Sequence, residues 1–208
     1  MQTLAAALRR KLGPNVGIAL RHPAEGGDLW PEERDAVARA IPKRQREYAA
    51  GRHAARAALA EVGVTPMAIP MRPDRSPVWP SGYIGSIAHC DSCCIALAAS
   101  LTDHPALGVD IEPTGQLEPD LIPVICTPEE RHWLAGTANP GFAALQIFSA
   151  KEAIYKAQYP QTGAVIGFDA VTISLAGDSF TFSSPLALPP LKGTILIHDG
   201  LMISVAYA

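Results

Sequence analysis

The sequence predicts an α+β protein made of two lobes in tandem, and three observations support this. A long helical segment is followed by apolar, strand-like runs, and the same order occurs a second time. The chain has 208 residues, 48% of them hydrophobic, which is enough for one sizeable core or two small lobes. Asp199-Gly200 between two apolar runs is a strong hairpin signal. We expect the lobes at residues 1–106 and 107–208, although no repeat of individual residues is evident.

One long helix is expected in the first lobe, over residues 42 to about 62. The segment begins with a proline suited to a first helical turn, is rich in alanine, and stops before Gly63. Arg52 and Arg56 lie four residues apart, so they share one face of this helix.

A loop and a hairpin are expected next. Residues 65–85 are rich in proline and glycine, which predicts a mostly irregular loop carrying Arg75. His89 follows, just before an apolar run. The runs 94–100 and 107–112 then predict an antiparallel hairpin.

The second lobe is expected to contain a short helix, a long helix and a set of strands. Asn139-Pro140-Gly141 breaks the chain before the long helix. The predicted helices cover residues 129–134 and 142–158, and the predicted strands cover 170–175, 179–183, 195–198 and 201–206.

Carboxylates in two places suggest a site for a divalent cation. In an extended strand Asp110 and Glu112 point to the same face, because successive side chains alternate. Glu152 and Lys156 lie i,i+4 on the long helix, and Lys151 precedes Glu152. Three carboxylates and two lysines suit magnesium-assisted chemistry on a pyrophosphate. Each half alone is more typical of a solvated polar strand edge or helix face.

Composition limits the partners and the compartment. The formal net charge of −3 gives no global field for binding nucleic acid or anionic membrane. No apolar run is long enough to span a bilayer, and the first residues lack the charge order of a secretory signal. We therefore expect a cytoplasmic protein with reduced cysteines. His89-Cys90 with Cys93-Cys94 resembles a metal cluster, but a second ligand pair is missing and a buried strand is the favoured interpretation.

Four motifs in a fixed order resemble the 4′-phosphopantetheinyl transferases, and especially the two-lobed type that includes the enterobactin-synthase activator. The resemblance covers roughly residues 40 to 175, and four ordered motifs are far more specific than any one alone. The motifs are Gly51-Arg52-His53-Ala54-Ala55-Arg56, Trp79-Pro80 with Gly85-Ser86-Ile87-Ala88-His89-Cys90, Gly108-Val109-Asp110-Ile111-Glu112, and Phe148-Ser149-Ala150-Lys151-Glu152-Ala153 with Tyr155-Lys156-Ala157.

This resemblance implies a fold, a reaction and a set of ligands. The family has two pseudo-symmetric α+β lobes with the active site in the cleft between them. There the 4′-phosphopantetheine arm of coenzyme A is transferred to a carrier-protein serine, with Mg²⁺, or Mn²⁺ as a substitute, and 3′,5′-ADP is released. The implied metal ligands are Asp110, Glu112 and Glu152. The implied catalytic residues are Lys151, Glu152 and Glu112, and the implied coenzyme-binding residues are Arg52, Arg56, Arg75, Ser86, His89, Lys151 and Lys156.

Two points stay open within the resemblance. Glu112, Glu152 or a metal-bound water would take the serine proton, and Glu130 is a further acidic residue at a position where the family often has one. The family usually has Ser or Thr directly before the histidine, whereas this chain has Ala88, so one hydroxyl contact to the coenzyme would be missing.

The acceptor is an apo acyl or peptidyl carrier protein of a fatty-acid, polyketide, nonribosomal-peptide or siderophore synthase, if the resemblance holds. Carrier proteins are acidic, so Arg44, Arg46 and Arg52 are candidates for a basic docking rim. We expect a monomer. The competing functions are a magnesium phosphohydrolase that needs no protein acceptor, and a non-catalytic module that binds coenzyme A or carrier protein.

Overall fold

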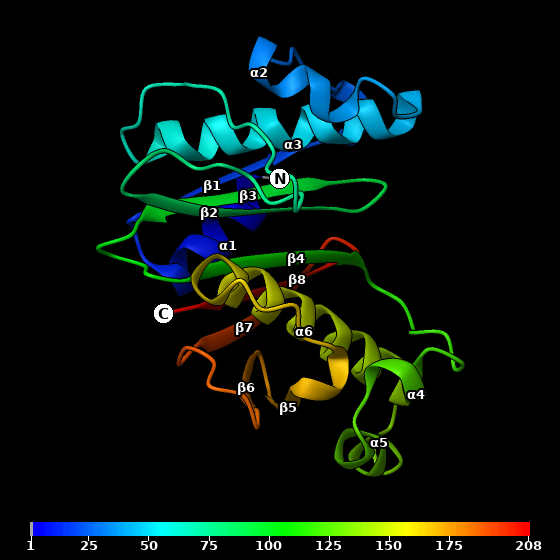
Figure 1. Ribbon diagram of the computed structural model, residues 1–208. Helices are drawn as coiled ribbons and strands as arrows, with labels where there is room; N and C mark the ends of the chain where they lie inside the picture. The colour runs from blue at the N-terminus through cyan, green and yellow to red at the C-terminus, as the bar shows by residue number, and fades with distance from the viewer. Residues whose placement is uncertain (1) are drawn as a thin grey trace. The chain divides into compact units, whose positions relative to one another are not determined.

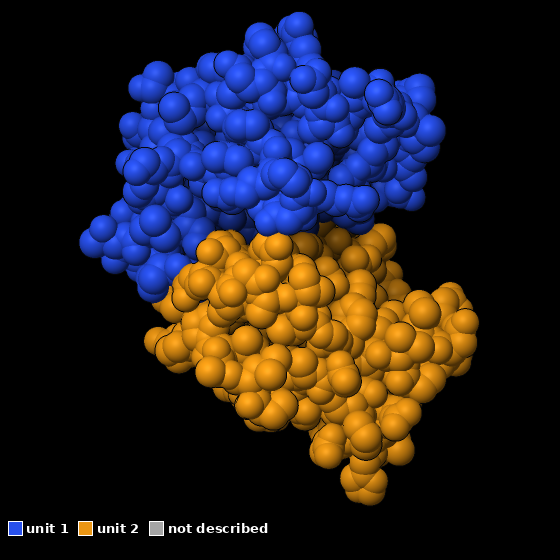
Figure 2. Space-filling view, in the orientation of Figure 1, with its two compact units in different colours: residues 1–107 blue, residues 108–208 orange. Residues whose placement is uncertain are grey.

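The computed structural model describes residues 2–208, which form two compact units, residues 1–107 and 108–208 (Figures 1 and 2). Each unit combines helices with one antiparallel sheet, so the predicted α+β class is confirmed. No helix in the described range is long and apolar enough to cross a bilayer.

The first unit consists of a three-stranded sheet covered by one long helix, α3 (Figure 1). The strand order is β1-β3-β2, and both pairings are antiparallel. The α-helices are α1 (Gln2–Leu12), α2 (Pro31–Arg34) and α3 (Pro42–Glu61), the short 3-10 turns are η1 (Pro23–Glu25) and η2 (Asp35–Val37), and the strands are β1 (Val16–Arg21), β2 (Tyr83–His89) and β3 (Cys94–Ser100).

Small residues let α3 approach this sheet closely. Ala54, Ala55 and Ala58 are fully buried against the sheet. A Cβ atom on Gly17 of β1 would collide with the carbonyl oxygen of Ala58, so a larger residue there would push the helix away.

The second unit contains the longer helix, α6, packed on a five-stranded sheet of order β4-β8-β7-β6-β5. A two-residue turn joins β7 to β8, with positive φ at Asp199 and Gly200, as predicted. The helices are α4 (Ile122–Ile125), α5 (Pro128–Leu134), α6 (Pro140–Thr162) and the 3-10 turn η3 (Phe168–Ala170), and the strands are β4 (Leu107–Pro113), β5 (Thr172–Ala176), β6 (Ser179–Ser183), β7 (Lys192–His198) and β8 (Leu201–Tyr207).

The structure corrects two expectations about the strands. The hairpin predicted for residues 94–100 and 107–112 is wrong, because β3 pairs with β1 and β2 whereas β4 belongs to the other sheet. The predicted loop 65–85 ends earlier than expected, since β2 begins at Tyr83. His89 is therefore the last residue of β2, paired with Cys94 at the start of the expected strand β3.

Candidate active site

Strand β4 places Asp110 and Glu112 on the face that packs against α6. Gly108 shares this face by strand alternation, and a Cβ on it would collide with the carbonyl oxygen of Ala153 in α6. The close approach of strand and helix puts both carboxylates beside the helix that carries Glu152.

Asp110 is held by two side chains of α6. It is 5% exposed, accepts a hydrogen bond from Ser149 Oγ at 2.9 Å, and pairs with Lys156 Nζ at 2.7 Å. Lys156 Nζ also lies 4.0 Å from a carboxylate oxygen of Glu152. One ammonium group therefore serves two carboxylates. We call Asp110, Glu112, Glu152 and Lys156 the carboxylate cluster.

The electrostatics of this cluster favour the binding of a cation. Burial raises the pKa of Glu112 to about 7, and the negative charges of Asp110 and Glu152 add to the shift while Lys156 opposes it. Burial also raises the pKa of Glu152, where Lys156 lowers it and Asp110 raises it. Three carboxylates with one ammonium leave an excess of negative charge, which a bound cation would relieve.

Magnesium fits the chemistry of this donor set. Mg²⁺ prefers oxygen ligands, usually one or two carboxylates with waters and phosphate oxygens. Within residues 2–208, no three carboxylate, imidazole or thiolate groups converge as a ready-made metal site. Lys156 instead supplies the positive charge between Asp110 and Glu152.

Lys151 has a different environment from Lys156. Its side chain is 2% exposed, and its ammonium donates to the carbonyl oxygens of Ile125 and Phe168 and to Glu130 Oε2, at 2.7 to 2.8 Å. All three of its N–H groups thus have protein acceptors. In this structure Lys151 ties together α4, α5, α6 and η3, and its contact with a pyrophosphate stays a prediction.

Arg56 is engaged in the same way in the first unit. Its Nη1 lies 2.7 and 2.8 Å from the two oxygens of the fully buried Glu33, and its Nη2 donates to the carbonyl oxygen of Asp28. The guanidinium also lies over the ring of Trp30. This geometry uses Arg56 to anchor the segment before α3, and its binding of coenzyme phosphates stays a prediction.

These two ion pairs belong to a repeat that the sequence analysis missed. Glu33 accepts from the backbone N–H groups of Trp30 and Ile69, and Glu130 accepts from those of Thr127 and Ile173. Each glutamate is the third residue of a short helix, and each pairs with a cation on the long helix of its unit. The sequence signal is the shared Pro-Glu-Glu-Arg in Trp30-Pro31-Glu32-Glu33-Arg34 and Thr127-Pro128-Glu129-Glu130-Arg131.

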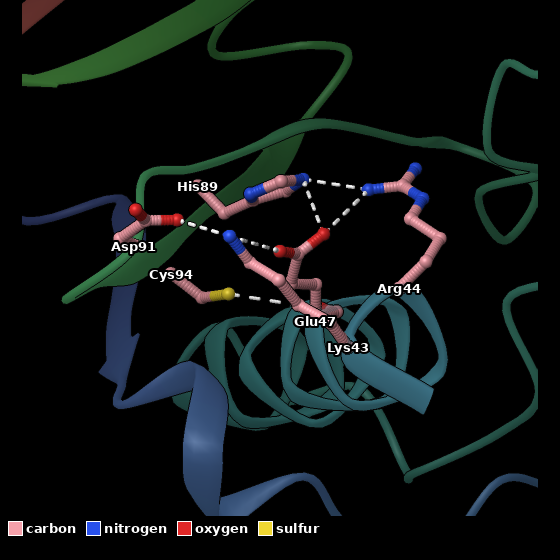
Figure 3. Close-up of polar contacts among 6 residues, drawn as sticks. All are labelled: Lys43, Arg44, Glu47, His89, Asp91 and Cys94. Atoms are coloured by element: carbon pink, nitrogen blue, oxygen red, sulfur yellow. Dashed lines mark hydrogen bonds and ion pairs between the residues drawn. The ribbon is translucent and has the colours of Figure 1, made fainter. Parts of the chain in front are cut away.

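A group of basic side chains lies where α3 meets the end of β2 (Figure 3). Arg44 Nη1 lies 2.7 Å from His89 Nε2, and Glu47 lies beside both. A guanidinium only donates hydrogen bonds, so the imidazole Nε2 accepts and the ring proton is on Nδ1.

Arg52 follows Arg44 by two helical turns on α3 and is 5% exposed. Its guanidinium lies 4.2 Å from the centre of the Tyr48 ring, and its buried Nε has no hydrogen-bond partner among the described residues. Burial lowers the pKa of Arg52, and the charge of Arg44 adds to this effect. A buried N–H without a partner is rare in proteins, and a bound ligand is one way to satisfy it. We call Arg44, Arg52 and His89 the basic group.

Ser86 and Arg75 are not brought to the basic group. Ile87 and His89 face α3, so Ser86 and Ala88, which alternate with them, lie on the opposite face of the sheet. Arg75 lies in an exposed turn with a positive φ of 72°, and its side chain makes no hydrogen bond or ion pair within residues 2–208.

All four cysteines are free thiols, and burial keeps Cys93 and Cys94 protonated. Burial raises the pKa of Cys93 to about 11 and of Cys94 to about 12. Such thiols are poor metal ligands and poor nucleophiles.

The two halves of the chain match two models of one family. Residues 32–99 match the N-terminal domain of 4′-phosphopantetheinyl transferases, and residues 106–192 match the 4′-phosphopantetheinyl transferase superfamily. The chain is 36% identical to the 4′-phosphopantetheinyl transferase Npt of Nocardia iowensis, over 86% of this chain and 89% of that protein. The chain belongs to the 4′-phosphopantetheinyl transferase superfamily.

Other relatives agree with this assignment. The chain is 42% identical to the 4′-phosphopantetheinyl transferase Svp of Streptomyces mobaraensis, over 79% of this chain and 69% of that protein. It is 39% identical to enterobactin synthase component D of Salmonella typhi, over 70% of this chain and 61% of that protein. The predicted enzyme class, a 4′-phosphopantetheinyl transferase, is thereby confirmed.

In this superfamily member, a mostly apolar pocket opens beside the carboxylate cluster. It has a volume of about 260 Å³ and lies entirely in the second unit. Its walls include Glu152, Tyr155, Val165, Ile166 and Phe168. An elongated, weakly polar group could lie in this pocket with one end at the Glu152 carboxylate.

Arg44, Arg46 and Arg52 of this transferase were candidates for a basic docking rim. The structure instead buries Arg52 and joins Arg44 to His89. The eight-residue spacing of Arg44 and Arg52 puts both on one face of α3, and this signal could have grouped the two arginines. The contact of Arg44 with His89 depends on the fold. Glu47 was missed because only the fold brings it near His89.

Proposed function

We propose that this enzyme transfers the 4′-phosphopantetheine group of coenzyme A to a serine hydroxyl of an apo acyl or peptidyl carrier protein, in a magnesium-dependent reaction. The carboxylate cluster carries the proposal, because it joins an excess of negative charge to an ammonium group inside the part of the chain that matches the superfamily. Asp110, Glu112 and Glu152 would hold Mg²⁺, or Mn²⁺ in its place. The ion would neutralise charge on the pyrophosphate.

The chemistry needs a base and a stabilised leaving group. The serine oxygen attacks the β-phosphorus, the bond from that phosphorus to the bridging oxygen breaks, and 3′,5′-ADP departs. The serine proton passes to a carboxylate, and the raised pKa values of Glu112 and Glu152 suit both to accept it. Lys156 stabilises the negative charge that develops on the phosphates.

The chemistry of coenzyme A also matches the basic group and the pocket beside Glu152. Its phosphates suit the basic group, where the unpartnered Nε of Arg52 provides a donor and His89 provides a second one when protonated. Its pantetheine arm is elongated and weakly polar, which suits the pocket beside Glu152. In this proposal the first unit provides phosphate-binding residues, and the second provides the metal ligands and Lys156.

Intact-mass spectrometry tests the function directly. Purified enzyme, Mg²⁺ and coenzyme A are incubated with apo carriers from fatty-acid, polyketide, nonribosomal-peptide and siderophore synthases. We expect at least one carrier to gain the mass of one phosphopantetheine arm. Failure with every carrier would refute the proposal. The same comparison shows which synthase class a monomeric, cytoplasmic enzyme of this kind would activate.

A matched variant separates catalysis from binding. Glu152→Gln should fold normally but lose transfer, because it removes one charged metal ligand and one candidate base. Exposed Glu118→Gln serves as the control and should keep full activity. Full activity of Glu152→Gln across a magnesium titration would contradict the ligand assignment. Phosphate release without a carrier would indicate a phosphohydrolase instead.

A further inference from the structure

Glu47 occupies a position behind Arg44 and His89 that no part of the proposed reaction uses (Figure 3). We propose that Glu47 is a positioning residue, which holds Arg44 and His89 together so that both are ready for one phosphate group. This inference rests on the proposed function, in which that phosphate is the 3′-phosphate of coenzyme A.

The contacts place one carboxylate among three basic side chains. Glu47 Oε2 lies 3.4 Å from Arg44 Nη1 and 3.9 Å from His89 Nε2, and Oε1 lies 3.9 Å from Lys43 Nζ. Lys43 has a nearer partner in Asp91, at 2.8 Å, so the pair that depends on Glu47 is Arg44 and His89.

The Glu47 side chain is less exposed to solvent than those of Arg44 and His89. The Glu47 side chain is 12% exposed, against 49% for Arg44 and 32% for His89. A ligand arriving from solvent meets the two basic groups first, and the carboxylate lies beneath them. Its repulsion of a phosphate therefore acts over a longer distance than the attraction of Arg44 and His89.

The backbone of Glu47 is fixed by the neighbouring strand. Its carbonyl oxygen accepts from Cys94 Sγ at 3.7 Å, and Cys94 is the residue paired with His89 across the β2–β3 ladder. Glu47 and His89 are therefore tied to the same point of the sheet.

Without Glu47, two unfavourable free-energy changes would accompany the binding of a phosphate. Arg44 is a long, half-exposed side chain, and ordering such a chain costs rotamer entropy. His89 Nε2 must carry a proton to donate to a phosphate, and it then no longer accepts the hydrogen bond from Arg44. A carboxylate near both groups reduces each cost before the ligand arrives.

The test measures binding of coenzyme A and of dephospho-coenzyme A, which lacks the 3′-phosphate, by titration calorimetry. Glu47→Gln and Glu47→Ala should weaken binding of coenzyme A by about three- to tenfold. Binding of dephospho-coenzyme A should not change, and kcat at saturating coenzyme A should stay near that of the wild type. Glu47→Asp should restore part of the lost affinity.

A double-mutant cycle tests whether Glu47 acts through Arg44. Arg44→Ala should cost less affinity in the Glu47→Ala background than in the wild type. The matched control is Glu61→Gln, which also removes a carboxylate of α3 paired with an arginine, at 2.7 Å from Arg9. This control should leave the ratio of the two affinities unchanged.

Several outcomes would overturn the inference. These are equal losses for both ligands, tighter binding of coenzyme A, strict additivity with Arg44→Ala, or unfolding of Glu47→Gln. A wild-type protein that binds both ligands equally would also overturn it, because there would be no 3′-phosphate site to order. Failure of the wild type to modify any carrier would instead refute the proposed function, and the two binding measurements remain separate from that result.

Discussion

At the scale of single residues, Glu112 couples the stability of the protein to pH. Its pKa in the folded protein is about 7, above its ordinary value of 4.5, because it is partly buried and lies near Asp110 and Glu152. The folded state therefore binds this proton more tightly than the unfolded state. The resulting stability is fully present below about pH 4.5 and is lost as the pH rises through about 7.

We expect Glu112→Gln to stabilise the protein at pH 8 when divalent metals are chelated. The gain should be about 1 kcal/mol after allowance for solvent screening of a half-buried group. Urea unfolding at pH 5 and pH 8 measures it, and most of the gain should be absent at pH 5. Glu118→Gln, which changes an exposed carboxylate, should show no such dependence. An equal gain at both pH values would contradict the assigned cause.

At the scale of helices and strands, Glu33–Arg56 and Glu130–Lys151 fix the long helices. Each pair is buried, and each glutamate also accepts two backbone N–H groups. Removing one member of such a pair leaves a charge without compensation. Lys151 directly precedes Glu152, so the second pair also sets the direction in which α6 presents Glu152.

We expect Lys151→Met and Arg56→Met each to lower the free energy of unfolding by about 3–5 kcal/mol. Chemical denaturation measures the loss. Lys192→Met, at an exposed strand position, should change it by less than about 0.5 kcal/mol. A fully stable Lys151→Met variant with impaired coenzyme A binding would restore a direct ligand role for Lys151.

Local patterns predicted the elements whose own residues specify them. Helices α3 and α6 and the β7–β8 turn follow from proline, alanine and Asp-Gly signals. Strand β2 was missed because Gly85, Ser86 and Ala88 have low strand propensity. The hairpin error arose because adjacency in sequence does not determine pairing when a chain passes from one sheet to another.

In the candidate site too, local sequence patterns predicted only the features that local residues specify. Alternation in β4 and the i,i+4 spacing in α6 are local, and they identified the residues of the carboxylate cluster. The burial of Lys151 and Arg56 depends on Glu130 and Glu33, which lie 21 and 23 residues away in the sequence. No local pattern separates such a lysine from one that faces a ligand.

At the scale of the whole molecule, the small net charge of the chain is the sum of two units with net charges of opposite sign. Residues 1–107 contain thirteen Lys and Arg against ten Asp and Glu, whereas residues 108–208 contain four against ten. The two units therefore present net charges of opposite sign to charged ligands.

We expect coenzyme A affinity to fall with ionic strength because the basic group is partly exposed. Raising salt from about 50 to 500 mM should weaken binding by about tenfold, and dephospho-coenzyme A should show a shallower dependence. Calorimetric titrations across this range measure both slopes. Equal slopes would mean that the 3′-phosphate does not meet the basic group.

The paired contacts of Gly17 with Ala58 and of Gly108 with Ala153 align the two units residue by residue. Arg56 and Lys151 each precede the contacting alanine by two residues. In this alignment the counterparts of Asp110, Glu112 and Glu152 are Ala19, Arg21 and Ala57. A gene that arose by internal duplication would have this pattern after one copy lost its acidic residues. The acidic set is thus present in the second unit, although the glycine–alanine contact between strand and helix occurs in both units.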